Sequence, residues 1–166
     1  MTAFSVASYN LAVMANLSAG LLLFRRTPAG AQVLLGHMGG PFWARKDQGA
    51  WTIFKGLPLP GEDHLVAARR ETLEETGLAP DGPFLPLVPI RQAGGKRVRA
   101  WAAETGADPT TLRSNATELE WPPRSGRRQS FPEIDRYAWL DLPEARRLIV
   151  HAQAALLDEL EVLLAG

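Results

Sequence analysis

One segment, Gly56–Leu78, most constrains what this chain can fold into, because its glutamates recur at helical spacing between two helix-boundary residues. Asp63 is a candidate N-cap, since a short carboxylate can accept hydrogen bonds from the free N–H groups of a first helical turn. Gly77 fits the left-handed position that commonly follows a helix, and Pro80 beyond it cannot continue one. The sequence therefore predicts a helix from about Asp63 to Gly77.

Three carboxylates share one face of this predicted helix. They belong to Glu71, Glu74 and Glu75, at positions i, i+3 and i+4, whereas Val66 and Leu73 face the other way. Like charges at these spacings repel. A solvated acidic surface is one interpretation. The other is a divalent-cation site, because oxygen ligands with open positions suit Mg²⁺ or Mn²⁺, which keep waters and bridge to substrate phosphates.

Composition narrows the class of protein around this helix. A chain of 166 residues is the size of one ordinary domain. Its 18 acidic and 18 basic residues balance, so no overall field points to bulk nucleic acid or an anionic membrane. The absence of cysteine excludes disulfides, thiolate nucleophiles and zinc–thiolate sites. No stretch approaches the ~20 apolar residues of a membrane span, and the expected location is cytoplasmic. A homodimer is left open.

Residues 1–17 form an apolar start that prompts comparison with a signal peptide. No Lys or Arg precedes Arg25, however, and Asn10 and Asn16 interrupt the apolar run, which is atypical of secretory signals. We therefore expect an extra strand, a loose arm or a misplaced start codon, followed by one domain over residues 18–166.

Strand and turn signals alternate through most of this domain. The predicted strands are Ser18–Arg25, Gln32–Met38, Trp51–Phe54, Phe84–Arg91, Arg97–Glu104 and Ile134–Leu140. Gly106–Phe131 is rich in Gly, Pro and Arg, so we expect it to be irregular and to cap the site or carry function. Leu142–Leu164 predicts one or two helices with a core-facing stripe of Leu156, Leu157, Leu160, Leu163 and Leu164.

The glutamate-rich segment resembles the Nudix box of the MutT-like Nudix hydrolases. That pattern is Gly, five residues, Glu, seven residues, Arg-Glu, an apolar residue, any residue, Glu-Glu, any residue, Gly and an apolar residue. The matching residues are Gly56, Glu62, Arg70, Glu71, Glu74, Glu75, Gly77 and Leu78. The chain departs at Thr72, where an apolar residue is usual, and at Phe54, where many relatives have Pro, but neither change removes a metal ligand. The resemblance implies an α/β Nudix fold: an α/β/α sandwich with a mixed, partly antiparallel sheet.

The resemblance also implies roles for the box residues. Glu74 and Glu75 would be the main ligands of Mg²⁺ or Mn²⁺, with the Gly56 carbonyl completing the shell. Glu71 would be a further ligand or the base that activates water. Arg70 would hold a box glutamate by a bidentate pair and so support the site without gripping phosphate.

Two more acidic positions follow from the same resemblance. Glu62 would lie beside the metal shell or orient Arg70. Relatives often draw a further acid from a distant loop, and Glu133 is the candidate here, with Glu118 and Glu120 as rivals.

Basic and aromatic residues supply candidates for substrate contact. Phosphate could be held by Lys55, Lys96, Arg124, Arg127 and Arg128. Trp43, Trp101 and Trp121 offer stacking surfaces for a base, although tryptophan is as often part of a core. The three histidines have no metal-ligand spacing and are interpreted as structural.

The implied activity is hydrolysis of a pyrophosphate bond in a small-molecule nucleotide, by attack of a metal-activated water on phosphorus. The substrate would be a nucleoside diphosphate linked to another moiety, of the nucleoside triphosphate or dinucleoside polyphosphate class. Ala93, Gly94 and Gly95 stand where some substrate subgroups carry Pro or Tyr, so those labels gain no support. One alternative is a non-catalytic Nudix-fold module that binds nucleotide or RNA, although such modules usually lose box glutamates. An isomerase of the same fold would need a catalytic cysteine.

Overall fold

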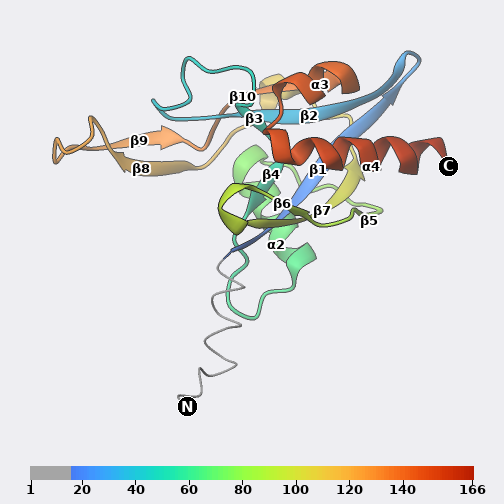
Figure 1. Ribbon diagram of the computed structural model, residues 1–166, viewed down its shortest axis with the longest axis horizontal. Helices are drawn as coiled ribbons and strands as arrows, with labels where there is room; N and C mark the ends of the chain where they lie inside the picture. Colours follow the sequence, from blue (N-terminus) through green and yellow to red (C-terminus); the bar gives the residue numbers. More distant parts are fainter. Residues whose placement is uncertain (1–15) are drawn as a thin grey trace.

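A mixed β-sheet lies between two helical layers in the computed structural model, which describes residues 16–166 (Figure 1). Strands β1 (Leu17–Thr27) and β2 (Gly30–Met38) form the hairpin expected from the sequence. Strand β10 (Ile134–Asp141) pairs antiparallel with β2, and β7 (Arg97–Glu104) runs parallel to β1 on its other side. The mixed sheet that the family resemblance implies is therefore confirmed.

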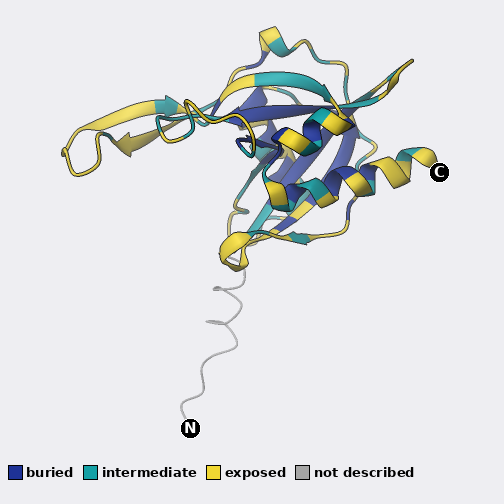
Figure 2. Ribbon diagram, turned by 45° about the horizontal axis from the view of Figure 1, so that its top comes forward, coloured by how far each residue is buried: buried dark blue, intermediate teal, exposed yellow. Residues whose placement is uncertain are grey.

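The helices cover opposite faces of this sheet. Helix α2 (His64–Thr76) packs on the face that includes Leu21, Leu23 and Phe54. Helices α3 (Leu142–Leu148) and α4 (Ala154–Ala165) pack on the other face. Figure 2 shows the buried strands between them. Both faces of β1 are covered, which explains its continuous apolar run in place of an alternating pattern.

The predicted boundaries of the glutamate-rich helix are confirmed. The Asp63 carboxylate accepts a hydrogen bond from the Val66 N–H at 3.1 Å. Gly77 has a φ of 81° and donates its N–H to the Leu73 carbonyl at 2.8 Å. A Cβ would be strained at that φ, so glycine lets the chain leave the helix here.

Two predicted strands are each divided in the structure. Trp51–Phe54 separates into β3 (Trp51–Thr52), which pairs with β2, and β4 (Phe54–Gly56), which pairs with β1. Phe84–Arg91 separates into β5 (Leu85–Pro86) and β6 (Ile90–Arg91), both paired with β7. Proline has no N–H to donate to a ladder, which accounts for the short pairings around Pro86 and Pro89.

The prediction that Gly106–Phe131 is irregular is wrong for its second half. After the short 3₁₀ turn η2 (Pro109–Thr111), strands β8 (Ala116–Glu120) and β9 (Arg128–Pro132) pair as an antiparallel hairpin. We call residues 116–132 the hairpin arm. It projects away from the sandwich, and nine of its ten strand residues are exposed (Figures 1 and 2). These two strands were not predicted because the arm is polar, and an alternating hydrophobic pattern indicates a strand only where one face of the strand is buried.

The C-terminal segment forms α3, a 3₁₀ turn η3 (His151–Gln153) and α4. Leu156, Leu157 and Leu160 are fully buried, as predicted, but Leu163 is 40% exposed and does not belong to the core. A third 3₁₀ turn, η1 (Ala93–Gly95), joins β6 to β7. Within residues 16–166, no helix combines the length and apolarity that crossing a membrane requires.

The expectation for residues 1–17 falls almost entirely outside the described part of the chain. Strand β1 begins at Leu17, one residue before the predicted domain start. The Asn16 carbonyl accepts a hydrogen bond from the Arg97 N–H at 2.7 Å, so the start of β1 lies directly beside the start of β7.

Candidate active site

Helix α2 presents a mixed face to the sheet. Ala67, Ala68 and Thr72 are fully buried against β1 and β4. The Thr72 hydroxyl donates to the Ala68 carbonyl at 2.8 Å, so the polar residue at a usually apolar position has its hydrogen bond. Val66 and Leu73, on the side away from the glutamates, are about half exposed. The small residues let the helix approach the sheet closely enough to carry Glu75 inside.

Glu75 is the most buried of the three clustered glutamates, at 5% exposure. Its Oε2 atom is buried and has no hydrogen-bond partner within residues 16–166. Burial, followed by the negative charges of Glu133 and Glu71, raises the pKa of Glu75 to about 9. A buried carboxylate with an unbonded oxygen is costly, so this position calls for a positive partner.

Glu71 lies against the backbone of Gly56. A Cβ added to Gly56 would lie 2.1 Å from the Glu71 carboxyl carbon, so only glycine leaves room for this side chain. Burial raises the pKa of Glu71, and the nearby charge of Glu74 adds to that rise while Arg70 opposes it. Gly56 and Glu71 are thus in direct contact.

Arg70 is held among carboxylates and a carbonyl. Its Nε and Nη2 atoms donate to the two oxygens of Glu62, each at 2.9 Å, in a bidentate pair. Its Nη1 donates to Glu71 at 3.0 Å and to Glu74 at 3.2 Å, and Nη2 also reaches the Leu57 carbonyl. The Arg70 bond and the Leu59 N–H lower the pKa of Glu62 to about 2. Glu62 therefore orients Arg70, and all three guanidinium nitrogens are engaged.

Glu133 lies beside the box helix although 58 residues separate it from Glu75. Its N–H donates to the Asn115 carbonyl at 3.0 Å, and the Asn115 N–H donates to the Glu74 carbonyl at 2.8 Å. Burial and the charge of Glu74 raise the pKa of Glu133. Its rivals Glu118 and Glu120 lie on the exposed β8, where Glu118 pairs with Arg128 at 3.4 Å. Of the three, Glu133 is the one whose charge acts on Glu75.

Lys55 and Lys96 lie at the same end of the sheet. Burial lowers the pKa of Lys55, Glu75 and Glu71 oppose that change, and the charge of Lys96 adds to it. Strand β4 carries Lys55 directly before Gly56, which places its ammonium group near the carboxylates. Lys55 therefore lies close to the cluster, and Lys96 lies close enough to Lys55 for its charge to act on it.

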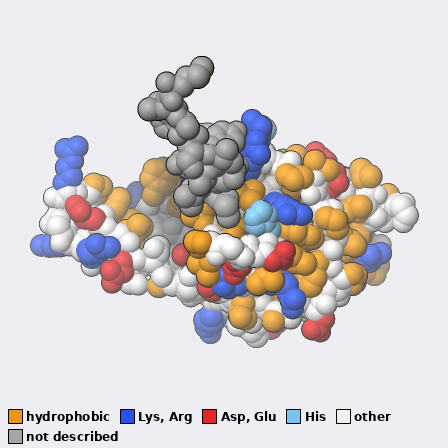
Figure 3. Space-filling view, turned by 90° about the horizontal axis from the view of Figure 1, so that it is seen from below, with side chains coloured by type: hydrophobic (Ala, Val, Ile, Leu, Met, Phe, Trp, Pro, Cys, Tyr) orange, Lys and Arg blue, Asp and Glu red, His pale blue; other side chains and the backbone are white. Residues whose placement is uncertain are grey.

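The three predicted arginines of the hairpin arm lie elsewhere. Arg124 and Arg127 are in the turn at its far end, and Arg128 begins β9. A five-residue strand separates Arg128 from Glu133, which corresponds to about 17 Å. Figure 3 shows basic side chains along this projecting arm. The structure thus separates these arginines from the carboxylate cluster.

The tryptophans differ in accessibility. Trp101 is 7% exposed and belongs to the core on the α2 side, so its interpretation as a stacking surface is wrong. Trp43 is partly buried against the opposite core, and Trp121 lies on the hairpin arm. The histidine at position 37 is structural, as expected: it is fully buried between Asp135 and the Lys46 carbonyl.

The residues present fit a divalent cation on two grounds. The unbonded Glu75 oxygen and the repulsion among Glu71, Glu75 and Glu133 would both be relieved by one. Within residues 16–166, however, no three carboxylates or histidines converge as a ready-made ligand cage. The physical reason is Arg70, which draws Glu71 and Glu74 toward itself.

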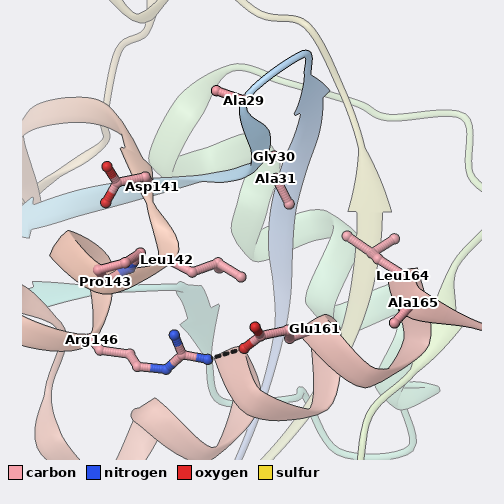
Figure 4. Close-up of a pocket in the computed structure, with 10 residues that line it drawn as sticks. All are labelled: Ala29, Gly30, Ala31, Asp141, Leu142, Pro143, Arg146, Glu161, Leu164 and Ala165. Atoms are coloured by element: carbon pink, nitrogen blue, oxygen red, sulfur yellow. Dashed lines mark hydrogen bonds and ion pairs between the residues drawn. The ribbon is translucent and has the colours of Figure 1, made fainter.

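A cavity elsewhere on the molecule is lined by other residues than those of the carboxylate cluster. A shallow cavity of about 400 Å³ lies between the β1–β2 turn, the start of α3 and the end of α4 (Figure 4). Arg146 and Glu161 face each other across it as an ion pair. No box residue lines this cavity, so it is separate from the carboxylate cluster.

Two residues at the cluster were not predicted. The Tyr137 hydroxyl, on β10, donates to the Glu75 carbonyl, and burial raises the pKa of Tyr137 to about 12. Asn115 bridges Glu74 and Glu133 through its backbone. Neither contact leaves a local pattern in the sequence, because both depend on pairing between distant segments.

Comparison with known proteins agrees with this geometry. The family described as "NUDIX domain" matches residues 14–160. The structure is similar to a Caenorhabditis elegans Ap4A hydrolase in a binary complex, with 24% identity, 90% of this chain and 98% of that chain covered, and a TM-score of 0.64. It is also similar to the NUDIX domain of Shewanella oneidensis NrtR complexed with ADP ribose (15% identity, 89% and 87% covered, TM-score 0.63). A MutT protein from Methanosarcina mazei is 18% identical, with 90% and 95% covered and a TM-score of 0.55.

Proposed function

The chain belongs to the Nudix family of pyrophosphohydrolases, and on this premise we propose that it hydrolyses a pyrophosphate bond in a nucleotide with the help of Mg²⁺ or Mn²⁺. The proposed substrates are nucleoside diphosphates linked to another moiety, of the nucleoside triphosphate or dinucleoside polyphosphate class. The observation that carries the proposal is the buried Glu75 carboxylate, whose Oε2 has no hydrogen-bond partner in the described chain and faces the charges of Glu71 and Glu133.

Glu74, Glu75 and the Gly56 carbonyl would hold the cation, with Glu71 as a further candidate. Such an ion, when bound, neutralises pyrophosphate oxygens and lowers the pKa of a water molecule. Glu74 is the most accessible of the three glutamates and is held by one Arg70 bond at 3.2 Å. A change of its side-chain rotamer would therefore free its carboxylate without breaking the Arg70–Glu62 pair.

Glu71 and Glu133 are the two candidates for the group that takes the proton from the attacking water. Burial raises the pKa of each, which brings a carboxylate closer to the range in which a general base works best. Glu133 differs from Glu71 in having no Arg70 bond. Its position at the base of the hairpin arm leaves it available to a water molecule beside the cluster.

Lys55 and Lys96 are the proposed phosphate contacts, since Lys55 lies near the carboxylates and Lys96 lies near Lys55. Arg70 is excluded from this role because Glu62, Glu71, Glu74 and the Leu57 carbonyl already occupy its donors. The arginines of the hairpin arm could contact only a part of the substrate that extends well beyond the cleaved bond.

The test is release of phosphate or pyrophosphate from a panel of nucleoside triphosphates, diadenosine polyphosphates and nucleotide sugars. Each is assayed with Mg²⁺, with Mn²⁺ and with EDTA, for the wild type, Glu75→Gln and Glu159→Gln. The last variant is the matched control, because Glu159 lies on α4 across the sheet. We expect turnover that requires metal and falls by at least 100-fold in Glu75→Gln alone.

Absence of turnover across the whole panel would contradict the proposal. If nucleotides then bound tightly in a metal-dependent manner, the chain would be a binding module, which is the alternative from the sequence. Retained activity in Glu75→Gln would instead reject the assignment of Glu75 as a ligand.

A further inference from the structure

The C-terminal end of α2 is held by donors that come from distant parts of the chain. A helix leaves its last four carbonyls without partners inside the helix. In α2 these carbonyls all find donors, and three of the four donors are backbone N–H groups. The pairs are Gly77 to Leu73 at 2.8 Å, Asn115 to Glu74 at 2.8 Å, Arg113 to Thr76 at 3.2 Å, and the Tyr137 hydroxyl to Glu75.

Tyr137 is the side chain in this set, and its surroundings fix its position. It lies on β10 opposite Gly36 of β2, and its ring packs against Phe54 with centroids 6.0 Å apart. Strand β10 and the strands that carry Gly36 and Phe54 belong to one sheet, so the hydroxyl is presented to the helix from that sheet. The hydrogen bond therefore ties the last turn of the box helix to the sheet at residue 75.

Beyond the backbone N–H of Lys55, Glu75 has little else to define where its carboxylate points. Its Oε2 has no partner in residues 16–166, and the acidic side chains of Glu133 and Glu71 lie close by. The location of this oxygen consequently depends on where the helix backbone holds the Glu75 peptide. A loss of the bond at that peptide would leave the last turn freer to move.

We propose that Tyr137 is a positioning residue for Glu75, whose hydroxyl anchors the last turn of α2 so that the Glu75 carboxylate is preorganised toward a divalent cation. The cation itself rests on the proposed function. Tyr137 touches the backbone of Glu75 and has no place among the reacting groups. Its removal should weaken metal binding by more than its effect on stability explains.

The test compares Tyr137→Phe with Thr72→Val. Each removes one hydroxyl that donates to a carbonyl of α2, and each keeps nearly the same side-chain shape. The Thr72 bond ends at Ala68, on the face of the helix turned to the core, so Thr72→Val removes a comparable hydroxyl without touching the Glu75 peptide.

The measurements are Mn²⁺ affinity by titration calorimetry and electron paramagnetic resonance, thermal melting in EDTA, and amide hydrogen exchange over residues 73–78. We expect Tyr137→Phe to lower Mn²⁺ affinity by about 10-fold, in the range typical of groups that orient metal ligands. Exchange in the last turn of α2 should quicken in the same variant without metal. Thr72→Val should keep its Mn²⁺ affinity within about 2-fold of the wild type, whatever the change in its melting temperature.

Unchanged Mn²⁺ affinity and exchange in Tyr137→Phe would overturn the inference, and so would an equal loss of affinity in Thr72→Val. Failure of the proposed function gives a different result: a wild type that binds Mn²⁺ but hydrolyses nothing on the nucleotide panel. In that case the affinity ratio between Tyr137→Phe and Thr72→Val still decides the role of Tyr137. A wild type that does not bind Mn²⁺ would reject both.

Discussion

Replacing Glu75 with glutamine should raise the stability of the metal-free protein, and the gain should grow with pH. The pKa of Glu75 is about 9 in the folded chain, against 4.5 for the unperturbed side chain. Between these values the unfolded chain releases the proton and the folded chain keeps it. Unfolding therefore becomes easier as pH rises from 4.5 toward 9, whereas glutamine carries no such proton.

The size of the effect follows from the two pKa values. One pH unit in this window corresponds to 1.36 kcal/mol, and pH 7 lies about 2.5 units above the unfolded value. The wild type should therefore be less stable than Glu75→Gln by about 3 kcal/mol at pH 7, with a small difference at pH 5. For a domain of this size, that gap corresponds to roughly 6–12 °C in melting temperature. Glutamine has almost the same volume, so packing contributes little.

The assay is urea unfolding in EDTA at pH 5 and pH 7, followed by the fluorescence of the buried tryptophans. Glu159→Gln on α4 serves as the control for loss of a glutamate charge away from the site. A Glu75→Gln variant that is less stable than the wild type at pH 7, or equally stable at both pH values, would refute the electrostatic reasoning. Excess Mg²⁺ should reverse the order, because the cation stabilises the wild type that binds it.

Three further changes test other parts of the structure. Gly56→Ala should abolish turnover while far-ultraviolet circular dichroism stays normal, since the new Cβ would collide with the Glu71 carboxyl. The control is Gly106→Ala, which should be active because nothing lies within 4 Å of the new Cβ. A fully active Gly56→Ala would contradict the contact between Gly56 and Glu71. His37→Phe should lower the free energy of unfolding by about 2 kcal/mol in urea titrations, because the buried imidazole loses its hydrogen bonds to Asp135 and to the Lys46 carbonyl; a loss below 1 kcal/mol would argue against that account. Replacing the three arginines of the hairpin arm with glutamine should raise KM for long dinucleoside polyphosphates more than for nucleoside triphosphates, and equal KM changes for both would reject a substrate contact.

The helix that carries the site was predictable because its information is local. Asp63 and Gly77 mark its ends through hydrogen bonds within three or four residues, and the glutamate spacing defines one face. The strand β7 was predicted with its observed bounds, Arg97–Glu104, since one sequence run forms the whole element.

Other features depend on segments that meet only in the folded chain. The strands of the hairpin arm have no buried face, so their sequence has no hydrophobic pattern that predicts a strand. Trp101 was a stacking candidate by its residue type alone, yet β7 is covered on both faces and Trp101 packs under α2. The bond from Tyr137 to Glu75 spans 62 residues and follows from the register of β10 alone.

The charge balance at the cluster connects the structural role of Arg70 with the proposed chemistry. Five carboxylates lie together here: Glu62, Glu71 and Glu74 bind Arg70, and the charges of Glu71, Glu74, Glu75 and Glu133 act on one another. Arg70 and Lys55 act on these carboxylates and Lys96 acts on Lys55, so with these three cations two negative charges would remain if every group were ionised. Protonation of Glu75 neutralises one of these two negative charges in the metal-free protein, and one divalent cation would neutralise both. A second bound cation would then require further negative charge, which the phosphates of the substrate supply. This balance predicts one metal per chain in the absence of nucleotide, countable by calorimetric stoichiometry with Mn²⁺.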